Sequence, residues 1–394
     1  MAPGGRVRVL IVDDSVVMRS LLRTVVSADP GLEVAASAAD GESALRAIES
    51  TKPDLVLLDL EMPVMDGLAT LRALRARNQK TPVIMCSSLT QRGARVTIEA
   101  LASGASDYVA KPANQSGREA ATQALAKDLI PKIRALTGQL QIQFREVFPQ
   151  ATGGVPGLPS CQGARSGPRQ ALSTLLPAAP YRAQPISSTP AVLTIGVSTG
   201  GPAALDRILP ALPATFPLPV LIVQHMPEMF TRLFAERMNG RCRLQVREAA
   251  EGDAVRGGVI YIARGNWHME VLAPSLAGAP PTLHLNQGPL ENHCRPAVDV
   301  LFRSAAQVFG AGVLAVVLTG MGSDGLIGCR VIRDRGGSVL AQDQPSSTVW
   351  GMPGAVSDAG LANRVLPLDA MIPEILRTAS RTHSEARRFL RSVV

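Results

Sequence analysis

The chain has 394 residues, of which 46% are hydrophobic, 18% charged and 3% aromatic, so it is long enough for two or three domains and too apolar to be disordered. Its net charge of +8 lies mainly in residues 126–189 and after residue 376, whereas the stretches with regular hydrophobic patterning are close to neutral. Because a nucleic-acid-binding domain carries its positive charge on the folded recognition surface, we expect no nucleic-acid partner.

The sequence also indicates a cellular compartment. No apolar run approaches the ~20 residues of a membrane-spanning helix, and the short apolar run that ends at Asp13 lacks the features of a signal peptide. The five cysteines are scattered and form no Cys-x-x-Cys pair, which excludes a disulfide framework and argues against structural zinc. We expect a cytoplasmic protein with no membrane insertion.

Residues 1–125 are predicted to form one compact domain. Apolar strand-like runs alternate with amphipathic stretches such as Ser15–Ser27 and Glu42–Ile48. Strands separated by helices pair in parallel, so five of them predict a doubly wound domain. The expected strands are Val7–Val12, Leu32–Ala36, Asp54–Leu58, Pro82–Cys86 and Tyr108–Val109.

Residues 126–189 are predicted to be a flexible linker. The part up to residue 144 is compatible with the extension of a last helix, and from about residue 149 the chain is rich in Pro, Gly, Ser and Ala. Strand–helix alternation resumes over residues 190–380, and residues 381–394 form a basic tail. The expected strands of the second domain are Val192–Val197, Pro219–Val223, Val259–Ala263, Gly312–Leu318 and Ser338–Ala341. The predicted fold class is α/β, with two doubly wound parallel-sheet domains, the first flavodoxin-like and the second Rossmann-like.

Polar side chains follow the strands of the first domain. Asp13 and Asp14 end the first strand, Asp59 ends the third, and Ser87 and Lys111 follow the fourth and fifth. The carboxyl ends of parallel strands share one edge of a sheet. Crowded carboxylates repel one another unless a cation lies among them, and Mg²⁺ prefers such oxygen ligands. Each aspartate alone could be a helix N-cap, but the whole set favours a site.

The first domain resembles the receiver domain of two-component response regulators over essentially all of residues 6–125. Besides the residues just named, the resemblance rests on Met62-Pro63, Asp66-Gly67 and Tyr108, which stands three positions before Lys111-Pro112. It implies that Asp59 accepts a phosphoryl group from a histidine kinase. The other implied roles are Mg²⁺ binding by Asp13 and Asp14 together with Asp59, a phosphoryl contact by Lys111, and a relay of the change by Ser87 and Tyr108.

The segment Gly196-Val197-Ser198-Thr199-Gly200 fits the pattern Gly-x-Ser-x-Gly and stands between an apolar strand and a helix expected over Pro202–Leu209. Its glycines permit a tight turn that lifts the serine hydroxyl from the sheet edge. Backbone N–H groups near the serine, at Thr199 and Gly200, could then receive an oxyanion. Glycine-rich turns also bind phosphate, but the lysine of a Walker loop is missing. We expect Ser198 to be a nucleophile.

A serine nucleophile needs a base, and the base needs an acid that orients it. His225 follows a core strand on the same edge as Ser198, which favours it over the other histidines, His268, His284, His293 and His383. Asp324 follows the strand Gly312–Leu318; Asp343 is the alternative acid, and capping of the next helix is the alternative role of Asp324. The order Ser, His, Asp excludes the α/β-hydrolase fold, in which the histidine comes last.

The second domain resembles the CheB family of chemotaxis protein-glutamate methylesterases. The shared motifs are Gly-Val-Ser198-Thr199-Gly-Gly, Val-Gln-His225-Met-Pro, Arg295-Pro296-Ala297-Val298-Asp299-Val300-Leu301-Phe302 and Leu-Thr-Gly-Met321-Gly-Ser-Asp324-Gly. The resemblance implies hydrolysis of glutamyl methyl esters on methyl-accepting chemotaxis receptors without a cofactor, deamidation of receptor glutamines, and an oxyanion donor near Met321. Cys294 departs from the family pattern, because a histidine usually stands directly before Arg-Pro.

The order of the two domains suggests how activity is controlled. We expect the receiver to pack over the Ser198 edge until phosphorylation at Asp59 loosens it. Two other interpretations stay open. In one, the second half is a transcriptional or binding module, which would need a helix-turn-helix and a basic face. In the other, it is an esterase-like domain that binds a partner without catalysis.

Overall fold

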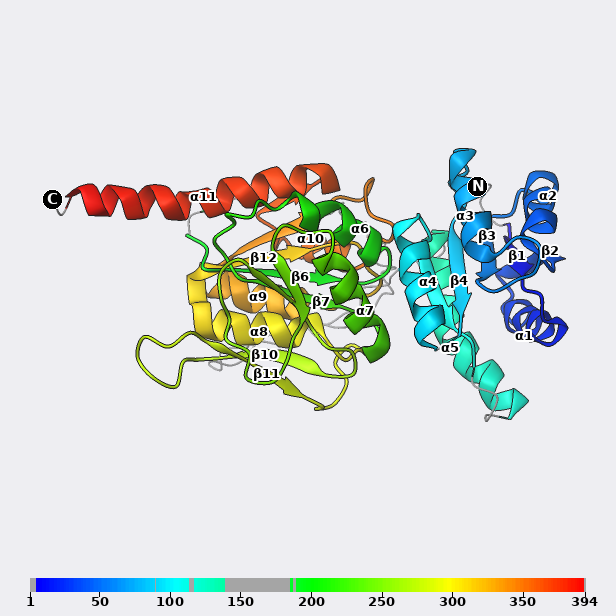
Figure 1. Ribbon diagram of the computed structural model, residues 1–394, viewed down its shortest axis with the longest axis horizontal. Coiled ribbons are helices and arrows are strands. Elements are labelled where there is room, and N and C mark those ends of the chain that lie inside the picture. Colours follow the sequence, from blue (N-terminus) through cyan, green and yellow to red (C-terminus); the bar gives the residue numbers. More distant parts are fainter. Residues whose placement is uncertain (1–4, 89, 113–116, 139–184, 187–188, 393–394) are drawn as a thin grey trace, which may run out of the picture.

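The structure, a computed structural model, describes residues 5–88, 90–112, 117–138, 185–186 and 189–392. It consists of two α/β units that lie side by side (Figure 1). Most of the predicted linker, and with it the predicted flexibility, lies outside the described residues. Among the residues that are described, no helix combines the length and the hydropathy that crossing a membrane requires.

The first unit is a five-stranded parallel sheet in the order β2-β1-β3-β4-β5, which is the flavodoxin-like order. Its strands are β1 (Val7–Val12), β2 (Leu32–Ala38), β3 (Leu55–Asp59), β4 (Val83–Ser87) and β5 (Asp107–Ala110). Its helices are α1 (Val16–Ser27), α2 (Gly41–Thr51), α3 (Gly67–Ala76), α4 (Gln91–Ala102) and α5 (Arg118–Leu136). The inner strands are buried on both faces, which is why they are continuous apolar runs in the sequence.

The second unit is a seven-stranded sheet in the order β14-β13-β12-β6-β7-β9-β8, and all of its strand pairs are parallel. The strands are β6 (Val192–Val197), β7 (Val220–Gln224), β8 (Gln245–Glu248), β9 (Val259–Ile262), β12 (Val313–Val317), β13 (Ser338–Gln342) and β14 (Arg364–Leu366). A separate antiparallel hairpin consists of β10 (His268–Leu272) and β11 (Thr282–Asn286). The predicted fold class of two parallel-sheet α/β domains is confirmed.

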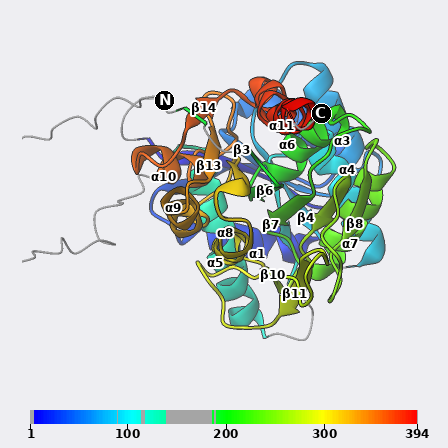
Figure 2. The ribbon, with the colours of Figure 1, turned by 90° about the vertical axis from the view of Figure 1, so that its left-hand side faces the viewer.

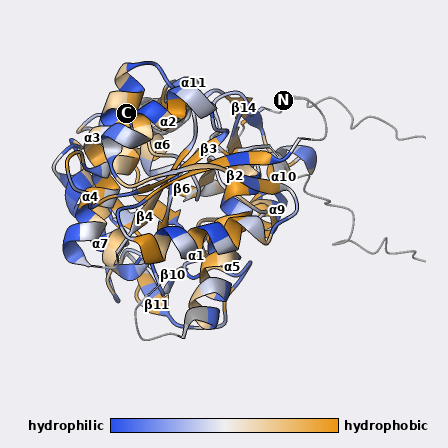
Figure 3. Cartoon of the chain, turned by 90° about the vertical axis from the view of Figure 1, so that its right-hand side faces the viewer, coloured by the Kyte–Doolittle hydropathy of each residue, from blue (hydrophilic) through white to orange (hydrophobic). Residues whose placement is uncertain are grey.

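Helices cover both faces of the second sheet. They are α6 (Gly201–Ile208), α7 (Glu228–Asn239), α8 (Val298–Phe309), α9 (Leu326–Asp334), α10 (Met352–Asp358) and α11 (Leu368–Ser392), with short 3-10 turns at Leu209–Ala211 and Gly310–Gly312. Figure 2 shows α6 and α11 on one side of the sheet and α8 and α9 on the other. Hydrophobic strands run between helices whose outer sides are hydrophilic (Figure 3).

Two of the predicted domain boundaries fall inside helices. Helix α5 crosses residue 125 and ends at Leu136, and its residues Leu129 and Ile133 are fully buried in the core of the first unit. Helix α11 likewise crosses residue 380. The first unit therefore includes at least the whole of α5, because that helix supplies part of its core.

The two units pack against each other through α4 of the first and α6 and α7 of the second. Figure 1 shows α4 and α5 facing α6 and α7. The ring of Tyr108 in β5 stacks on the ring of Phe230 in α7, with 4.6 Å between centroids and an interplanar angle of 15°. Stacked aromatic rings and a shared buried apolar cluster join the two units here.

Candidate active site and phosphorylation site

The residues predicted to form the nucleophile, base and acid follow three neighbouring strands of the second sheet. Ser198 follows β6, His225 follows β7, and the loop with Asp324 follows β12. The strand order reverses at β6, because the chain first proceeds outward through β7 and later returns to add β12 on the other side. Ligand sites of open parallel sheets lie at the carboxyl ends of the strands at such a reversal.

Backbone hydrogen bonds hold the serine turn in place. The N–H of Ser198 donates to the Thr319 carbonyl at 3.0 Å, and the Ser198 carbonyl accepts from Gly201 N at 2.8 Å and from Nε2 of Gln224 at 3.1 Å. Gly200 has a φ of 76°, the left-handed region that favours glycine. A Cβ atom at Gly320 would lie 2.9 Å from Cβ of Ser198, so glycine is needed for this approach of the two loops.

The imidazole of His225 is paired with Asp324. Its Nε2 lies 2.8 Å from Oδ2 of the carboxylate, and the two side chains are 13% and 2% exposed. Burial alone would lower the pKa of His225, but the hydrogen bond that the ring donates to Asp324 outweighs burial and raises this pKa to about 10. The pair thus has the geometry of a base that is oriented by an acid.

Asp324 stands at the N-terminus of α8 and does not cap the helix that follows it. Its Oδ2 accepts from Val298 N at 2.7 Å, and its Oδ1 accepts from Asp299 N at 3.0 Å and from Gly325 N at 3.0 Å. The N-cap residue of α9 is Gly325, which makes no side-chain cap. Burial would raise the pKa of Asp324, but its hydrogen bonds with His225 and these backbone donors lower it, as expected for an acid at a helix N-terminus.

A neighbouring carboxylate and an amide complete the surroundings of this acid. Asn292 donates through Nδ2 to Oδ1 of Asp324 at 2.9 Å and to Oδ2 of Asp299 at 3.0 Å. Burial raises the pKa of Asp299 to about 6, although a hydrogen bond from Gly328 N opposes the shift. The sequence patterns gave Asn292 no role, because nothing in its neighbourhood shows that it folds back onto a loop 32 residues away.

The other ring nitrogen of His225 faces a thiol. Nδ1 lies 3.6 Å from Sγ of Cys294, which is half-buried. Within the described residues, Ser198 Oγ makes no hydrogen bond to the imidazole, although the two residues lie next to each other at the ends of paired strands and His225 N donates to the Val197 carbonyl at 3.3 Å. The serine and the base are therefore adjacent but not yet hydrogen-bonded.

The alternative candidates lie elsewhere. Asp343 accepts hydrogen bonds from the backbone and hydroxyl of Ser346 and does not contact His225. His268 is buried between the Pro289 carbonyl and Ala297 N, His284 faces Glu251, and the side chain of His383 lies outside the described residues. His293 is on the turn before Cys294.

Three backbone N–H groups are available near the serine. In the part of the chain that the structure describes, those of Thr199, Gly200 and Met321 donate to no acceptor. They lie in the two loops that follow β6 and β12, which approach each other at Ser198 and Gly320. Unpaired amides at this point suit the binding of an oxyanion.

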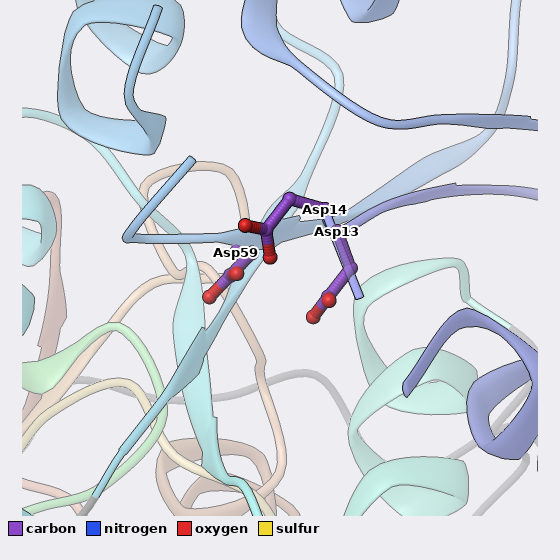
Figure 4. Close-up of side chains that lie close together, drawn as sticks. All are labelled: Asp13, Asp14 and Asp59. Carbon is purple, nitrogen blue, oxygen red and sulfur yellow. The ribbon is translucent and has the colours of Figure 1, made fainter. Parts of the chain in front are cut away.

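The acidic residues of the first unit form a second site. Carboxylate oxygens of Asp13, Asp14 and Asp59 all lie within 4.8 Å of one another (Figure 4). Nζ of Lys111 lies 2.8 Å from Oδ2 of Asp13 and 2.7 Å from Oδ1 of Asp59. Burial raises the pKa of Asp59 despite these contacts, while the two carboxylates outweigh burial and raise the pKa of Lys111. The three clustered carboxylates offer the oxygen ligands that Mg²⁺ prefers, and the ammonium beside them can pair with an added anionic group.

Ser87 and Tyr108, the two residues predicted to relay a change, have different surroundings: only Ser87 lies beside the acidic pocket. The pocket, of about 270 Å³, is lined by Asp14, Asp59, Lys111 and others including Ser88. Ser87 is fully buried beside it and accepts a hydrogen bond from Oγ1 of Thr97 in α4 at 2.7 Å. Tyr108 points the other way, to the second unit.

A hydrogen bond connects the first unit directly to the nucleophile turn. Oγ1 of Thr199 donates to Oδ2 of Asp107 at 2.8 Å, and both side chains are buried. The next residue, Tyr108, is covered on its other side by Lys132, whose Nζ donates to the Tyr108 carbonyl at 2.7 Å. The receiver-like unit therefore touches the residue next to Ser198.

Comparisons with known proteins agree with both halves. A family model described as CheB methylesterase matches residues 193–375, and one described as response regulator receiver domain matches residues 9–123. Among curated relatives, a protein-glutamate methylesterase/protein-glutamine glutaminase of a Nocardioides species is 48% identical over 95% of this chain and 96% of its own length. The protein of that name from Trichodesmium erythraeum is 44% identical over 94% and 98%. Among solved structures, the CheB methylesterase catalytic domain of Thermotoga maritima matches with 38% identity and a TM-score of 0.46, covering 48% of this chain and 99% of that domain.

Proposed function

The chain belongs to the family of CheB methylesterases that carry a receiver domain, and on that premise we propose that Ser198, His225 and Asp324 hydrolyse glutamyl methyl esters on methyl-accepting chemotaxis receptors. The observation that carries the proposal is the hydrogen bond of 2.8 Å between His225 and Asp324 at the strand ends beside Ser198. The same site would convert receptor glutamines to glutamate, and both reactions serve chemotactic adaptation.

The proposed reaction begins with Ser198. Its Oγ attacks the ester carbonyl carbon while Nδ1 of His225 takes the hydroxyl proton, because Nε2 is held by Asp324. The oxyanion accepts hydrogen bonds from backbone N–H groups at Thr199, Gly200 and Met321; loss of one such donor lowers rates by about 10²–10³-fold. The imidazolium then returns the proton to the leaving methoxide, and methanol departs from the acyl-enzyme.

Water completes the proposed cycle. His225 takes a proton from the water molecule that attacks the acyl carbon, and returns it to Ser198 Oγ as the glutamate carboxylate leaves. A glutamine side chain follows the same path with ammonia as the leaving group. Asp324 stays ionised throughout, because its backbone donors at the start of α8 stabilise the charge.

The proposed control resides in the first unit. A histidine kinase of the chemotaxis pathway would transfer a phosphoryl group to Asp59. Asp13, Asp14 and Asp59 would hold Mg²⁺, which neutralises the charge that gathers there. Lys111 already spans Asp13 and Asp59 and would bind a phosphoryl oxygen. Ser87, fixed by Thr97 of α4, would reorient toward the phosphoryl group and shift α4 with it.

Docking of the first unit supports inhibition by occlusion. Asp107 and Tyr108 contact Thr199 and Phe230 at the serine edge, so a receptor helix and the receiver compete for this surface. The predicted domains (1–125, 126–189, 190–380 and a basic tail from 381 to 394) remain our proposal for how the chain divides, with the first extended through α5. We place the protein in the cytoplasm, where both partners present their signalling parts.

The test is methanol release from methylated receptor membranes, with and without acetyl phosphate and Mg²⁺. We expect release by the full chain, stimulation by the phosphodonor, and no release by S198A, which only removes a half-buried hydroxyl. Labelling of the wild type but not of S198A by a fluorophosphonate distinguishes an active hydrolase from a domain that only binds. Wild-type turnover by S198A would contradict the proposal.

A further inference from the structure

Cys294 contacts the proposed base on the side away from Asp324. Its Sγ lies 3.6 Å from Nδ1 of His225, whereas Nε2 lies 2.8 Å from Oδ2 of Asp324. Because an ionised carboxylate only accepts hydrogen bonds, the neutral imidazole carries its proton on Nε2 and presents a lone pair from Nδ1. The thiol therefore occupies the ring nitrogen that must act on Ser198.

One tight turn positions both Cys294 and Asp324. The backbone N–H and carbonyl of Cys294 pair with the carbonyl and N–H of Glu291 at 2.8 and 3.2 Å. Between them, Asn292 and His293 have φ values of 50° and 62°, the left-handed pair of a type I′ turn. The Asn292 amide binds Asp324 at 2.9 Å. The thiol and the carboxylate are thus held in fixed places around the imidazole.

Ion pairs and hydrogen bonds hold this turn on both sides. The Arg303 guanidinium binds both carboxylate oxygens of Glu291, at 2.8 and 2.6 Å. Arg295 donates to the Gln287 and Gly288 carbonyls at 2.9 and 2.8 Å and to the side chain of Asn266. Because the backbone of this turn is held in place, the thiol of Cys294 has a fixed position beside the imidazole of His225.

We infer that Cys294 is a positioning residue of the base: its thiol hydrogen-bonds Nδ1 of His225 until the hydroxyl of Ser198 takes its place. The inference rests on the proposed function, because it takes His225 as the base of Ser198. The thiol proton stays on sulfur when the hydroxyl replaces it, so no group is consumed. Held this way, the ring keeps the tautomer in which Nδ1 can accept the serine proton.

The charges around the imidazole give the direction of the effect. Asp324 faces it from the loop before α9 and Cys294 from the turn before α8; Asp299 lies behind Asp324, and Arg303 lies beyond Glu291. Asp324 stabilises the protonated ring and raises the pKa of His225, whereas a thiol that donates to Nδ1 stabilises the neutral ring. Removal of the thiol donor therefore raises the pKa of His225, so a smaller fraction of the base is unprotonated at a given pH below this pKa.

The experiment measures the rate at which a fluorophosphonate labels Ser198 in the full chain, with Mg²⁺ and acetyl phosphate, as a function of pH. We expect C294A to move the acid limb to higher pH by about half a unit or more, which is about a threefold slower rate on that limb. C294S keeps a hydroxyl donor and should shift less. C242A is the matched control, because Cys242 is also half-buried but lies beside Asp206 and Arg241.

A second measurement uses the natural residue. Alkylation of Cys294 by iodoacetamide in the C242A chain covers Nδ1 and should slow labelling of Ser198 by about 10²-fold or more. Superimposable pH curves of C294A and wild type, or undiminished labelling after complete alkylation, overturn the inference. Absence of labelling in the wild type, equal to S198A, would instead contradict the proposed function, so the two failures are distinguishable.

Discussion

Asp324 uses its two oxygens for different purposes. Oδ2 binds the imidazole of His225 and Val298 N, while Oδ1 takes donors from Asn292, Asp299 N and Gly325 N. With five donors the carboxylate cannot rotate without losing several hydrogen bonds. A hydrogen bond to a charged group contributes about 1.5–3 kcal/mol to stability, so such a rotation is unfavourable. The start of α8 therefore fixes the orientation of the Asp324 carboxylate, and the carboxylate in turn orients the imidazole of His225.

Replacement of this acid gives a prediction. D324N keeps the shape of the side chain, but its amide N–H groups meet other donors and stabilise the wrong tautomer of His225. We expect turnover to fall by about 10⁴-fold, as in serine hydrolases whose acid is exchanged for an amide. The wild-type labelling rate of Ser198 should rise with pH to a midpoint above 6.5, because Asp324 raises the pKa of His225, and D324N should move this midpoint down.

The control is D343N, which alters an acid after the neighbouring strand β13 that contacts Ser346 and not the base. Its rate and pH profile should equal those of the wild type. A D324N chain that turns over normally would assign the orienting role elsewhere.

At this scale, the sequence predicts position well where a residue follows a core strand. Ser198, His225 and Asp324 were expected at one edge of the sheet and lie there, because β6, β7 and β12 are adjacent parallel strands that align their carboxyl ends; their catalytic roles stay a proposal. Asn292 and the contact of Cys294 could not be predicted in this way, because a loop that folds back 32 and 69 residues leaves no local periodicity. The alternative role of Asp324, capping of the helix that follows it, is wrong: the carboxylate binds the N-terminus of α8, which precedes it in the chain and folds back onto it.

At the scale of elements, β5 of the first unit meets the turn after β6 of the second. The contact consists of the hydrogen bond from Thr199 to Asp107 and the stacked rings of Tyr108 and Phe230. Asp107 also accepts from Tyr108 N at 2.8 Å, so one side chain orders both parts of the contact. Tyr108 is thereby held in direct contact with Phe230 of α7.

Removal of the Asp107 side chain should release the turn after β6 that carries Ser198 and Thr199. A hydrogen bond to a charged acceptor contributes about 1.5–3 kcal/mol, which corresponds to about a tenfold or larger shift of the docking equilibrium. We expect D107A to raise the methylesterase activity of the unphosphorylated chain by about tenfold or more. The measurement is methanol release without a phosphodonor.

D128A is the matched control, because Asp128 pairs with Lys132 at 2.9 Å as Asp107 does at 3.9 Å, but its exposed carboxylate bonds nothing in the second unit. Its basal activity should stay at the wild-type value. Equal activation by both variants would show that the loss of charge near Lys132, and not the contact with Thr199, is responsible.

Among the elements, buried parallel strands could be predicted within two residues of their ends, whereas other strands could not. Strands β8 and β14 are short edge strands with few buried residues, and β10 and β11 alternate in burial outside the main sheet. None of them forms the continuous apolar run that marked the inner strands. The contacts between the two units could not be predicted from the sequence, because the residues that form them have the same apolar pattern as the core residues of each unit.

At the scale of the whole molecule, phosphorylation should connect the acidic pocket with the serine edge. D59N removes the proposed phosphoryl acceptor but keeps its size. We expect no labelling by radioactive acetyl phosphate and no rise in methanol release when the phosphodonor is added. E61Q, which alters a residue at the same pocket, is the control and should keep both responses. Persistent labelling of D59N would assign the modification to another residue.

The docked arrangement has a consequence for the order of events. If the receiver and a receptor segment exclude each other at Thr199, each must weaken the binding of the other by the same factor. A ligand that engages Ser198 would thus free the receiver from its contact, and under the proposed control the freed receiver is the form that phosphorylation favours. Covalent modification of Ser198 by a bulky inhibitor should accordingly speed the phosphorylation of Asp59. Substrate binding would then promote phosphorylation through this interface, just as phosphorylation promotes substrate binding.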